Sequence, residues 1–473
     1  MLFACAQHHG KEIQRGATST AAASPAPKPL SVTERRSLRA VIDATLPAGG
    51  MQSLCVLDER GVQVYGRNAT LAIPPASAQK VVIAASALAD LGTNYRFVTT
   101  IGAERAPEGG VLHGNLWLVG SADPVLVSND LRGGVKIIAA QGVQDIRGGV
   151  RVDATFLSGP ERNPLWEASD AQYGFSAATS AISLDQDTIE VHATPSSEGL
   201  RARVWLEPPS GIVSVTGDVL TVAAGLPTTF DFQPLNRANA FGVSGQVAAD
   251  ERKAILYVPI RGIPLYVGDV LTRMLLKRGI RVAQPPSAGI APQLGVVLWK
   301  HRSMPLLQIV SKMLFESNNH LAEQLLRALG RVSSGVGSDQ AGVAAERALL
   351  RRYGIPRTGL VLVDGSGLSA NNRASASTLA RLLDDDRRHR GTRLYNALPR
   401  AGIEGTVRYY DVGAARGRVR AKSGHLAGVA SLAGYVFSRH SRTFAFAFLF
   451  ANGEDADNVD SRITRAVQRL ADF

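Results

Sequence analysis

The sequence predicts an α+β fold in which one mixed helix and strand domain is interrupted by a long β-rich insertion. Helix patterns gather near both ends of the chain, whereas residues 95 to 290 consist of short alternating apolar runs broken by Gly, Pro and Asp. Two consecutive strand patterns and a closing helix end the sequence. Because both ends carry the same mixed pattern, we expect them to build one core together.

A leader precedes the first predicted element. Residues 1 to 30 are expected to form a leader or a disordered N-terminus, because residues 16 to 30 are rich in Ala, Ser, Thr and Pro. The opening Met1-Leu-Phe-Ala-Cys5 is similar to the end of an apolar signal segment or to a lipid-attachment box, and an ordinary disordered tail is the alternative. The capping box Ser31-Val-Thr-Glu34 then predicts an amphipathic helix.

The remaining elements are assigned from periodicity. Residues 53–58 and 62–65 predict a hairpin, and the stretch between Pro75 and Gly92 predicts an apolar helix. Further helices are predicted near 131–142 and at 266–278, 305–315, 321–329 and 340–353, strands at 429–437 and 443–450, and a last helix from about residue 458. We therefore predict a discontinuous domain of residues 31–95 and 290–473 and an inserted β-rich region of residues 96–289.

Composition narrows the classes of partner and cofactor. The net charge of +12, from 52 basic and 40 acidic residues, favours an acidic cell-wall polymer or an anionic membrane surface as a peripheral partner. We expect no nucleic-acid partner, because no basic run is interleaved with aromatic residues. The two cysteines and nine histidines form no ligand spacing, so we expect neither a metal nor a cofactor. No apolar run reaches the roughly 18 residues of a membrane-spanning helix.

The helix after Pro75 carries a serine and a lysine in its first turn. Ser77 and Lys80 are three residues apart and therefore share one face. The unpaired N–H groups and the positive dipole end of a helix N-terminus favour a developing anion. A lysine can activate the serine only when it is neutral, which burial and a second cation promote. The alternative is a serine helix cap beside a solvated lysine.

Two further clusters carry residues for the same chemistry. Ser317-Asn-Asn319 lies in a predicted polar loop between two apolar helices, where a helix cap is the alternative. Lys422-Ser-Gly424 lies in a predicted strand, and its glycine permits the close backbone approach of a ligand. A charged edge strand that prevents aggregation is the alternative there.

In order, Ser77-Ala-Gln-Lys80, Ser317-Asn-Asn319 and Lys422-Ser-Gly424 resemble the motifs Ser-x-x-Lys, Ser-x-Asn and Lys-Thr/Ser-Gly of penicillin-binding proteins and serine β-lactamases. The long separation of the first two motifs is similar to that in the D-alanyl-D-alanine carboxypeptidase/endopeptidase family of class C low-molecular-mass penicillin-binding proteins, peptidase family S13. Other segments similar to that family are Gly120–Pro124, Tyr173–Ser176, Asp364–Ser369 with Asn372-Arg373, and Ala401–Thr406. The resemblance implies a transpeptidase-like catalytic domain.

The resemblance also implies a mechanism. Ser77 would attack the penultimate D-alanine carbonyl of a peptidoglycan stem peptide and form an acyl-enzyme, while Lys80 takes its proton. Ser317 would relay the proton to the leaving amine, and Asn319 would hold Lys80 and the substrate amide. β-Lactams would acylate the same serine. The family's setting implies a periplasmic or otherwise extracytoplasmic location.

The third motif is expected to bind substrate. Lys422 would help to keep Lys80 neutral and would bind the terminal carboxylate together with Ser423, whose hydroxyl replaces the commoner threonine. Gly424 and His425 complete this set, with the backbone N–H groups of Ser77 and His425 forming the oxyanion hole.

Other functions are weighed against this one. A serine β-lactamase shares the motifs but does not need the large insertion, and we find no Glu-x-x-Leu-Asn element. A non-catalytic cell-wall-binding protein would have lost a motif, and an α/β-hydrolase needs Gly-x-Ser-x-Gly. The sequence leaves open carboxypeptidase versus endopeptidase preference, the stem-peptide side chain, the oligomeric state and the role of residues 96–289.

Overall fold

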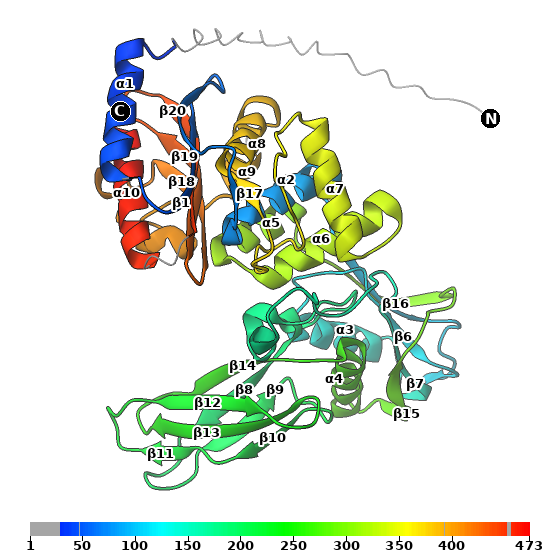
Figure 1. Cartoon of the computed structure of the whole chain (residues 1–473). Helices are drawn as coiled ribbons and strands as arrows, with labels where there is room; N and C mark the ends of the chain where they lie inside the picture. Colours follow the sequence, from blue (N-terminus) through cyan, green and yellow to red (C-terminus); the bar gives the residue numbers. More distant parts are fainter. Residues whose placement is uncertain (1–28, 47, 392, 452–455) are drawn as a thin grey trace, which may run out of the picture.

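The computed structural model describes residues 29–46, 48–391, 393–451 and 456–473, so most of the predicted leader lies outside the described residues. A five-stranded antiparallel sheet of order β18-β19-β20-β1-β2 joins the two ends of the chain (Figure 1). Its strands are β1 (Met51–Leu57), β2 (Gln63–Arg67), β18 (Val419–Leu426), β19 (Val429–Phe437) and β20 (Thr443–Ala451). The predicted N-terminal hairpin and the two predicted C-terminal strands therefore share one sheet, which confirms the α+β fold class.

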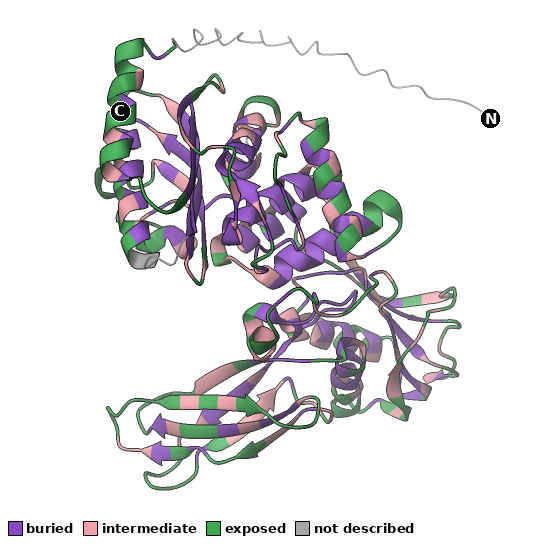
Figure 2. Ribbon diagram, viewed as in Figure 1, coloured by how far each residue is buried: buried purple, intermediate pink, exposed green. Residues whose placement is uncertain are grey.

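Helices cover both faces of this sheet. Two lie on one face, α1 (Val32–Thr45) and α10 (Ala456–Asp472), and on the other lie α2 (Lys80–Asp90), α5 (Leu306–Glu316), α6 (Asn319–Ser334), α7 (Asp339–Arg352), α8 (Ala376–His389) and α9 (Arg393–Ala397). Helix α1 begins at the predicted capping box, in which Ser31 and Glu34 exchange two hydrogen bonds. The three inner strands of the sheet, β1, β19 and β20, are buried almost throughout (Figure 2).

Helix α8 is not among the helices that the sequence predicts. Its first residue follows Ser375, whose side chain accepts a hydrogen bond from the Thr378 N–H as an N-cap. Several of its buried positions are polar, including Ser377, Asp384 and Asp386. An apolar period of 3.6 residues is therefore weak in this segment, although the cap is a usable signal.

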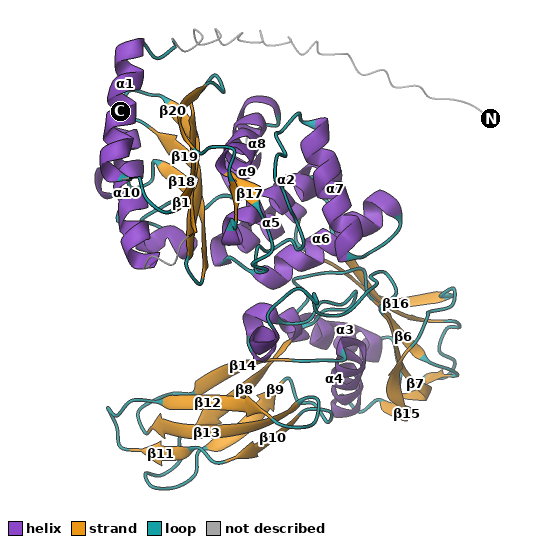
Figure 3. Ribbon diagram, viewed as in Figure 1, coloured by secondary structure: helices purple, strands orange, loops and turns teal. Residues whose placement is uncertain are grey.

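The middle of the chain is rich in strands, as predicted (Figure 3). It contains the helices α3 (Ser128–Ala140) and α4 (Ile263–Lys277). A six-stranded sheet has the order β15-β7-β6-β4-β16 with β5 beside β7, a four-stranded sheet consists of β10, β11, β12 and β13, and a three-stranded sheet has the order β14-β8-β9.

The bounds of the remaining strands are β3 (Ala72–Ile73), β4 (Val98–Ala103), β5 (Val111–Leu112), β6 (Leu116–Val119), β7 (Asp145–Asp153), β8 (Thr188–Thr194), β9 (Arg203–Glu207), β10 (Ser214–Gly217), β11 (Leu220–Val222), β12 (Thr229–Pro234), β13 (Ala240–Ala248), β14 (Ala254–Pro259), β15 (Arg281–Ala288), β16 (Val296–Arg302) and β17 (Ala374–Ser375). Strand β16 lies C-terminal to residue 289 yet pairs with β4. The division at residues 95/96 and 289/290 stays a prediction.

Candidate active site

The segment that carries Ser77 is a tight turn packed against the sheet. The predicted continuous helix begins with a 3₁₀ turn, η1 (Ala76–Gln79), and becomes α-helical at Lys80. Ala76 has a φ of 48°, a left-handed conformation that costs energy for a residue with a Cβ atom. The Ser431 hydroxyl on β19 donates a hydrogen bond of 2.7 Å to the Pro75 carbonyl. The sheet therefore helps to hold the turn that places Ser77.

Lys80 lies at the centre of the converging motifs. Its Nζ atom lies 2.9 Å from Ser77 Oγ, 2.6 Å from Asn319 Oδ1 and 2.8 Å from the Ser366 carbonyl oxygen. The side chain is fully buried, so these three acceptors match the three protons of an ammonium group. The structure thus brings Ser77, Lys80 and Asn319 into direct contact, although residues 77 and 319 come from distant parts of the chain.

The charge state of Lys80 follows from its surroundings. Burial lowers the pKa of Lys80 to about 7, although the carboxyl groups of Glu323 and Asp364 act in the opposite direction. Burial and the charge of Lys80 lower the pKa of Lys422 well below its usual value. Lys80, which lies beside the Ser77 hydroxyl, is therefore accessible as a neutral amine near neutral pH, and the buried Lys422 amine is close enough to interact with its charge.

The third motif lies on β18, which is an edge strand of the five-stranded sheet. A Cβ atom added to Gly424 would lie 2.6 Å from the Ser77 nitrogen and 2.7 Å from the Ala78 nitrogen, so the strand and the turn approach each other as only glycine permits. The Ala421 N–H on the outer edge of β18 donates to the Pro399 carbonyl. Strand alternation puts the N–H of His425 on the same edge as that of Ala421.

The remaining predicted residues surround this contact. Lys422 is buried and donates to the carbonyl of Ser423 at 2.5 Å, while the Ser423 hydroxyl lies 3.1 Å from Thr406 Oγ1. Ser317 is half-buried in a left-handed conformation at the end of α5. Within the described part of the chain, neither the Ser317 hydroxyl nor the Lys422 amine forms a hydrogen bond with Ser77 or Lys80.

Sequence reasoning missed Glu323 behind Lys80, whereas the loop of Asp364 was noted only as a segment similar to the family. Glu323 on α6 is buried and accepts hydrogen bonds from the N–H groups of Gly365 and Ser366. Asp364 accepts further backbone hydrogen bonds from the same loop, at 2.8 Å from both Gly367 and Ser369. The available signal was one acidic residue inside the apolar pattern of residues 321–329.

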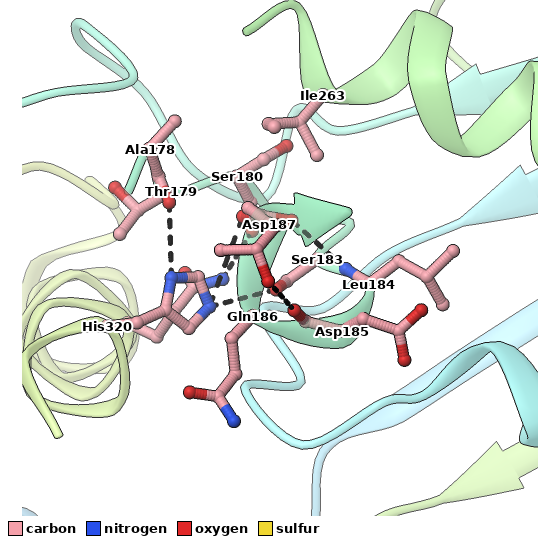
Figure 4. A network of polar contacts seen from close by, with 12 residues as sticks. Ala178, Thr179, Ser180, Ser183, Leu184, Asp185, Gln186, Asp187, Ile263 and His320 are labelled. Atoms are coloured by element: carbon pink, nitrogen blue, oxygen red, sulfur yellow. Dashed lines mark hydrogen bonds and ion pairs between the residues drawn. The ribbon is translucent and has the colours of Figure 1, made fainter. Parts of the chain in front are cut away.

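A second polar network ties α6 to the middle of the chain (Figure 4). His320 follows Asn319 directly, and its Nδ1 atom lies 3.1 Å from the Ala178 carbonyl and its Nε2 atom 2.9 Å from Ser183 Oγ. Burial lowers the pKa of His320 to about 4 and raises that of the nearby Asp187 well above its usual value. His320 is therefore neutral near neutral pH, and its two ring contacts help to fix the start of α6.

Nearly the whole chain matches one known protein family. Residues 38–472 match the model of the D-Ala-D-Ala carboxypeptidase 3 (S13) family. The chain belongs to this S13 family. The family comprises serine peptidases that act as D-Ala-D-Ala carboxypeptidases. The match confirms the predicted resemblance to this family of penicillin-binding proteins.

Individual relatives agree with this membership. The S13 chain is 33% identical over 435 residues to the D-alanyl-D-alanine carboxypeptidase of Actinomadura sp. (strain R39), covering 88% of this chain and 81% of the relative. It is 27% identical over 411 residues to the carboxypeptidase DacB of Haemophilus influenzae, covering 83% of each.

Solved structures show the same fold. The crystal structure of penicillin binding protein 4 from Haemophilus influenzae has a TM-score of 0.78 and 24% identity to the S13 chain, covering 91% of this chain and 98% of the other. The structure of that protein with a β-lactam has a TM-score of 0.73. Among the described residues, no helix combines the length and the apolar character that crossing a membrane requires.

Proposed function

We propose that this S13 peptidase removes the terminal D-alanine from peptidoglycan stem peptides through an acyl-enzyme on Ser77. The observation that carries the proposal is the distance of 2.9 Å between Lys80 Nζ and Ser77 Oγ. A serine hydroxyl needs a base before it attacks a carbonyl, and an amine whose pKa is lowered to about 7 is a base near neutral pH.

Acylation begins with proton transfer from the Ser77 hydroxyl to neutral Lys80. The Oγ atom then bonds to the carbonyl carbon of the penultimate D-alanine, and the carbonyl oxygen becomes an oxyanion. The N–H groups of Ser77 and His425 donate to that oxyanion, because Gly424 allows β18 to lie against the turn that carries Ser77. Loss of one such donor typically slows catalysis by about 100- to 1000-fold.

Collapse of this intermediate breaks the bond between the carbonyl carbon and the amide nitrogen. Ser317 gives its proton to the leaving amine and takes the one held by Lys80, which becomes neutral again, while Asn319 keeps Lys80 in position at 2.6 Å. Lys422 and Ser423 bind the carboxylate of the departing D-alanine. Water then hydrolyses the ester and restores the Ser77 hydroxyl.

Two further properties belong to this proposal. β-Lactams resemble the D-Ala-D-Ala terminus, so they should acylate Ser77 and remain bound. Because peptidoglycan lies outside the cytoplasm, the enzyme acts there, and its net charge of +12 suits a peripheral association with the acidic sacculus or membrane surface.

A fluorescent penicillin combined with intact-mass measurement tests the nucleophile. The wild-type enzyme should gain the mass of one penicillin and release D-alanine from a pentapeptide, and Ser77→Ala should do neither. Ser86→Ala is a matched control, because Ser86 is a buried serine of the same helix and takes no part in the site. An adduct that survives in Ser77→Ala overturns the proposal, and rapid loss of the adduct from the wild type favours a β-lactamase.

A further inference from the structure

A cavity lies beside His425, the residue that follows the third motif. It has a volume of about 480 Å³, and its walls come from the end of η5 (Gly405–Tyr409) and the segment that follows it, and from α10. The residues of this cavity that bear on its function are Tyr410, Asp411, Asp460, Ser461, Arg465 and Gln468. Its volume lies within the range of small-ligand sites in proteins.

Two walls of the cavity contact the residues expected to bind substrate. Asp460 Oδ2 lies 2.7 Å from His425 Nε2, and the Tyr410 hydroxyl lies beside both Asp460 and Ser423. Burial and the Asp460 carboxylate raise the pKa of Tyr410, so its hydroxyl stays protonated. The Asp460 side chain therefore separates the cavity from His425, and the Tyr410 side chain separates it from Ser423.

The chemistry of the cavity suits a polar, charged peptide. Two carboxylates and one guanidinium line it, together with the hydroxyl and amide groups of Ser461 and Gln468. Arg465 is exposed and forms no ion pair or side-chain hydrogen bond within the part of the chain that the structure describes. A guanidinium without a partner binds a ligand carboxylate readily, because its planar fork donates two parallel hydrogen bonds.

The direction of the substrate places the cavity on the leaving side. In the proposed function, Ser423 binds the carboxylate next to the amine that departs, so any chain attached to this amine extends past Ser423. A free D-alanine has no such chain. In a peptidoglycan cross-link, however, the departing amine belongs to a second stem peptide, which bears further carboxylates.

From these observations we infer that the cavity between η5 and α10 is the subsite for the departing stem peptide of a cross-link, with Arg465 as its carboxylate anchor. The inference rests on the proposed function and extends it from the terminal D-alanine to the leaving strand of a cross-linked substrate. Trimming of an uncross-linked pentapeptide does not need this subsite.

The test compares two purified substrates, a monomeric disaccharide pentapeptide and a cross-linked dimer. Arg465→Glu reverses the charge of the anchor, and Ser461→Trp fills the cavity from the exposed side of α10. Each variant should lower the rate of dimer cleavage relative to monomer cleavage by at least about tenfold, the equivalent of roughly 1.4 kcal/mol of binding energy. Arg469→Glu is the matched control, since it makes the same charge change one turn further along α10 and does not line the cavity.

The possible results separate this inference from the proposed function. If the wild type trims the monomer but leaves the dimer intact, or if both cavity variants lower the two rates equally, the subsite is overturned and the carboxypeptidase stands. If Arg469→Glu has the same selective effect as Arg465→Glu, the subsite is overturned as well. If Ser77→Ala cleaves either substrate, the proposed function fails whatever the cavity variants do.

Discussion

Glu323 accepts a hydrogen bond of 2.8 Å from the backbone N–H of Ser366, the residue whose carbonyl oxygen accepts a hydrogen bond of 2.8 Å from Lys80. One buried carboxyl group on α6 therefore positions an acceptor for the Lys80 amine without a direct hydrogen bond to it. The Lys80 amine thus contacts both the Ser77 hydroxyl and the Ser366 carbonyl oxygen.

Glu323 should act as a hydrogen-bond acceptor rather than as a charge. Burial raises its pKa to about 8, and one atom, Oε1, accepts from both Gly365 and Ser366. We expect Glu323→Gln, which keeps that oxygen, to acylate with penicillin within about fivefold of the wild-type rate. Glu323→Ala leaves two buried N–H groups unpaired and should slow acylation at least about tenfold. Equal rates for the two variants would contradict this account, whichever rate they share.

The acylation rate should depend on pH through Lys80. Because burial lowers its pKa to about 7, the active neutral amine is lost below that value and predominates above it. The second-order rate constant for penicillin acylation should rise with pH, reach half of its maximum near pH 7 and then level off. Circular dichroism over the same range must show an unchanged fold. A rate that is constant from pH 6 to pH 9 would exclude Lys80 as the base.

Gly424 should not tolerate a side chain. A Cβ atom there would lie within 2.7 Å of the backbone nitrogens of Ser77 and Ala78, which cannot move without shifting Ser77. We expect Gly424→Ala to slow penicillin acylation by about 100-fold, the effect of a displacement of about 1 Å at a reacting group. Gly133→Ala is the control, because its new Cβ atom would meet nothing within 4 Å. A normal rate in a folded Gly424→Ala enzyme would show that the strand and the turn are not in close contact.

His320 should make the fold sensitive to acid. Burial lowers its pKa to about 4, below the usual value of 6.5, so the unfolded chain binds a proton that the folded chain excludes. The free energy of unfolding should therefore fall as the pH is lowered from about 6.5 to about 4, by up to roughly 3 kcal/mol from this group. In urea unfolding, His320→Gln should lose less stability than the wild type over this range. Parallel losses in the two proteins would rule His320 out as the cause.

The sequence predicted the elements whose signals are local. The capping box at Ser31, the apolar helix after Pro75 and the loop at Ser317 each depend on neighbouring residues, and each occurs where expected. The contact of Ser77 with Lys80 was also predicted, because residues three apart share a helix face.

What the sequence could not predict depends on contacts between distant segments. Glu323 carries no motif, and its importance comes from a loop that begins at residue 364. In the sequence, Ser431 is only one polar position in an apolar strand. Its hydrogen bond to the Pro75 carbonyl becomes visible only in the structure. Helix α8 was missed because its buried face includes Asp384 and Asp386, which hide its apolar period.

The pairing of β1 with β20 has a consequence for biosynthesis. Ser77 is translated well before β18 and β19, the strands that lie against its turn. We expect that a polypeptide that ends before residue 419 would contain Ser77 without the strands that hold its turn and would not react with penicillin. Penicillin labelling should therefore begin only after strands β18 to β20 have been synthesised and have paired with β1.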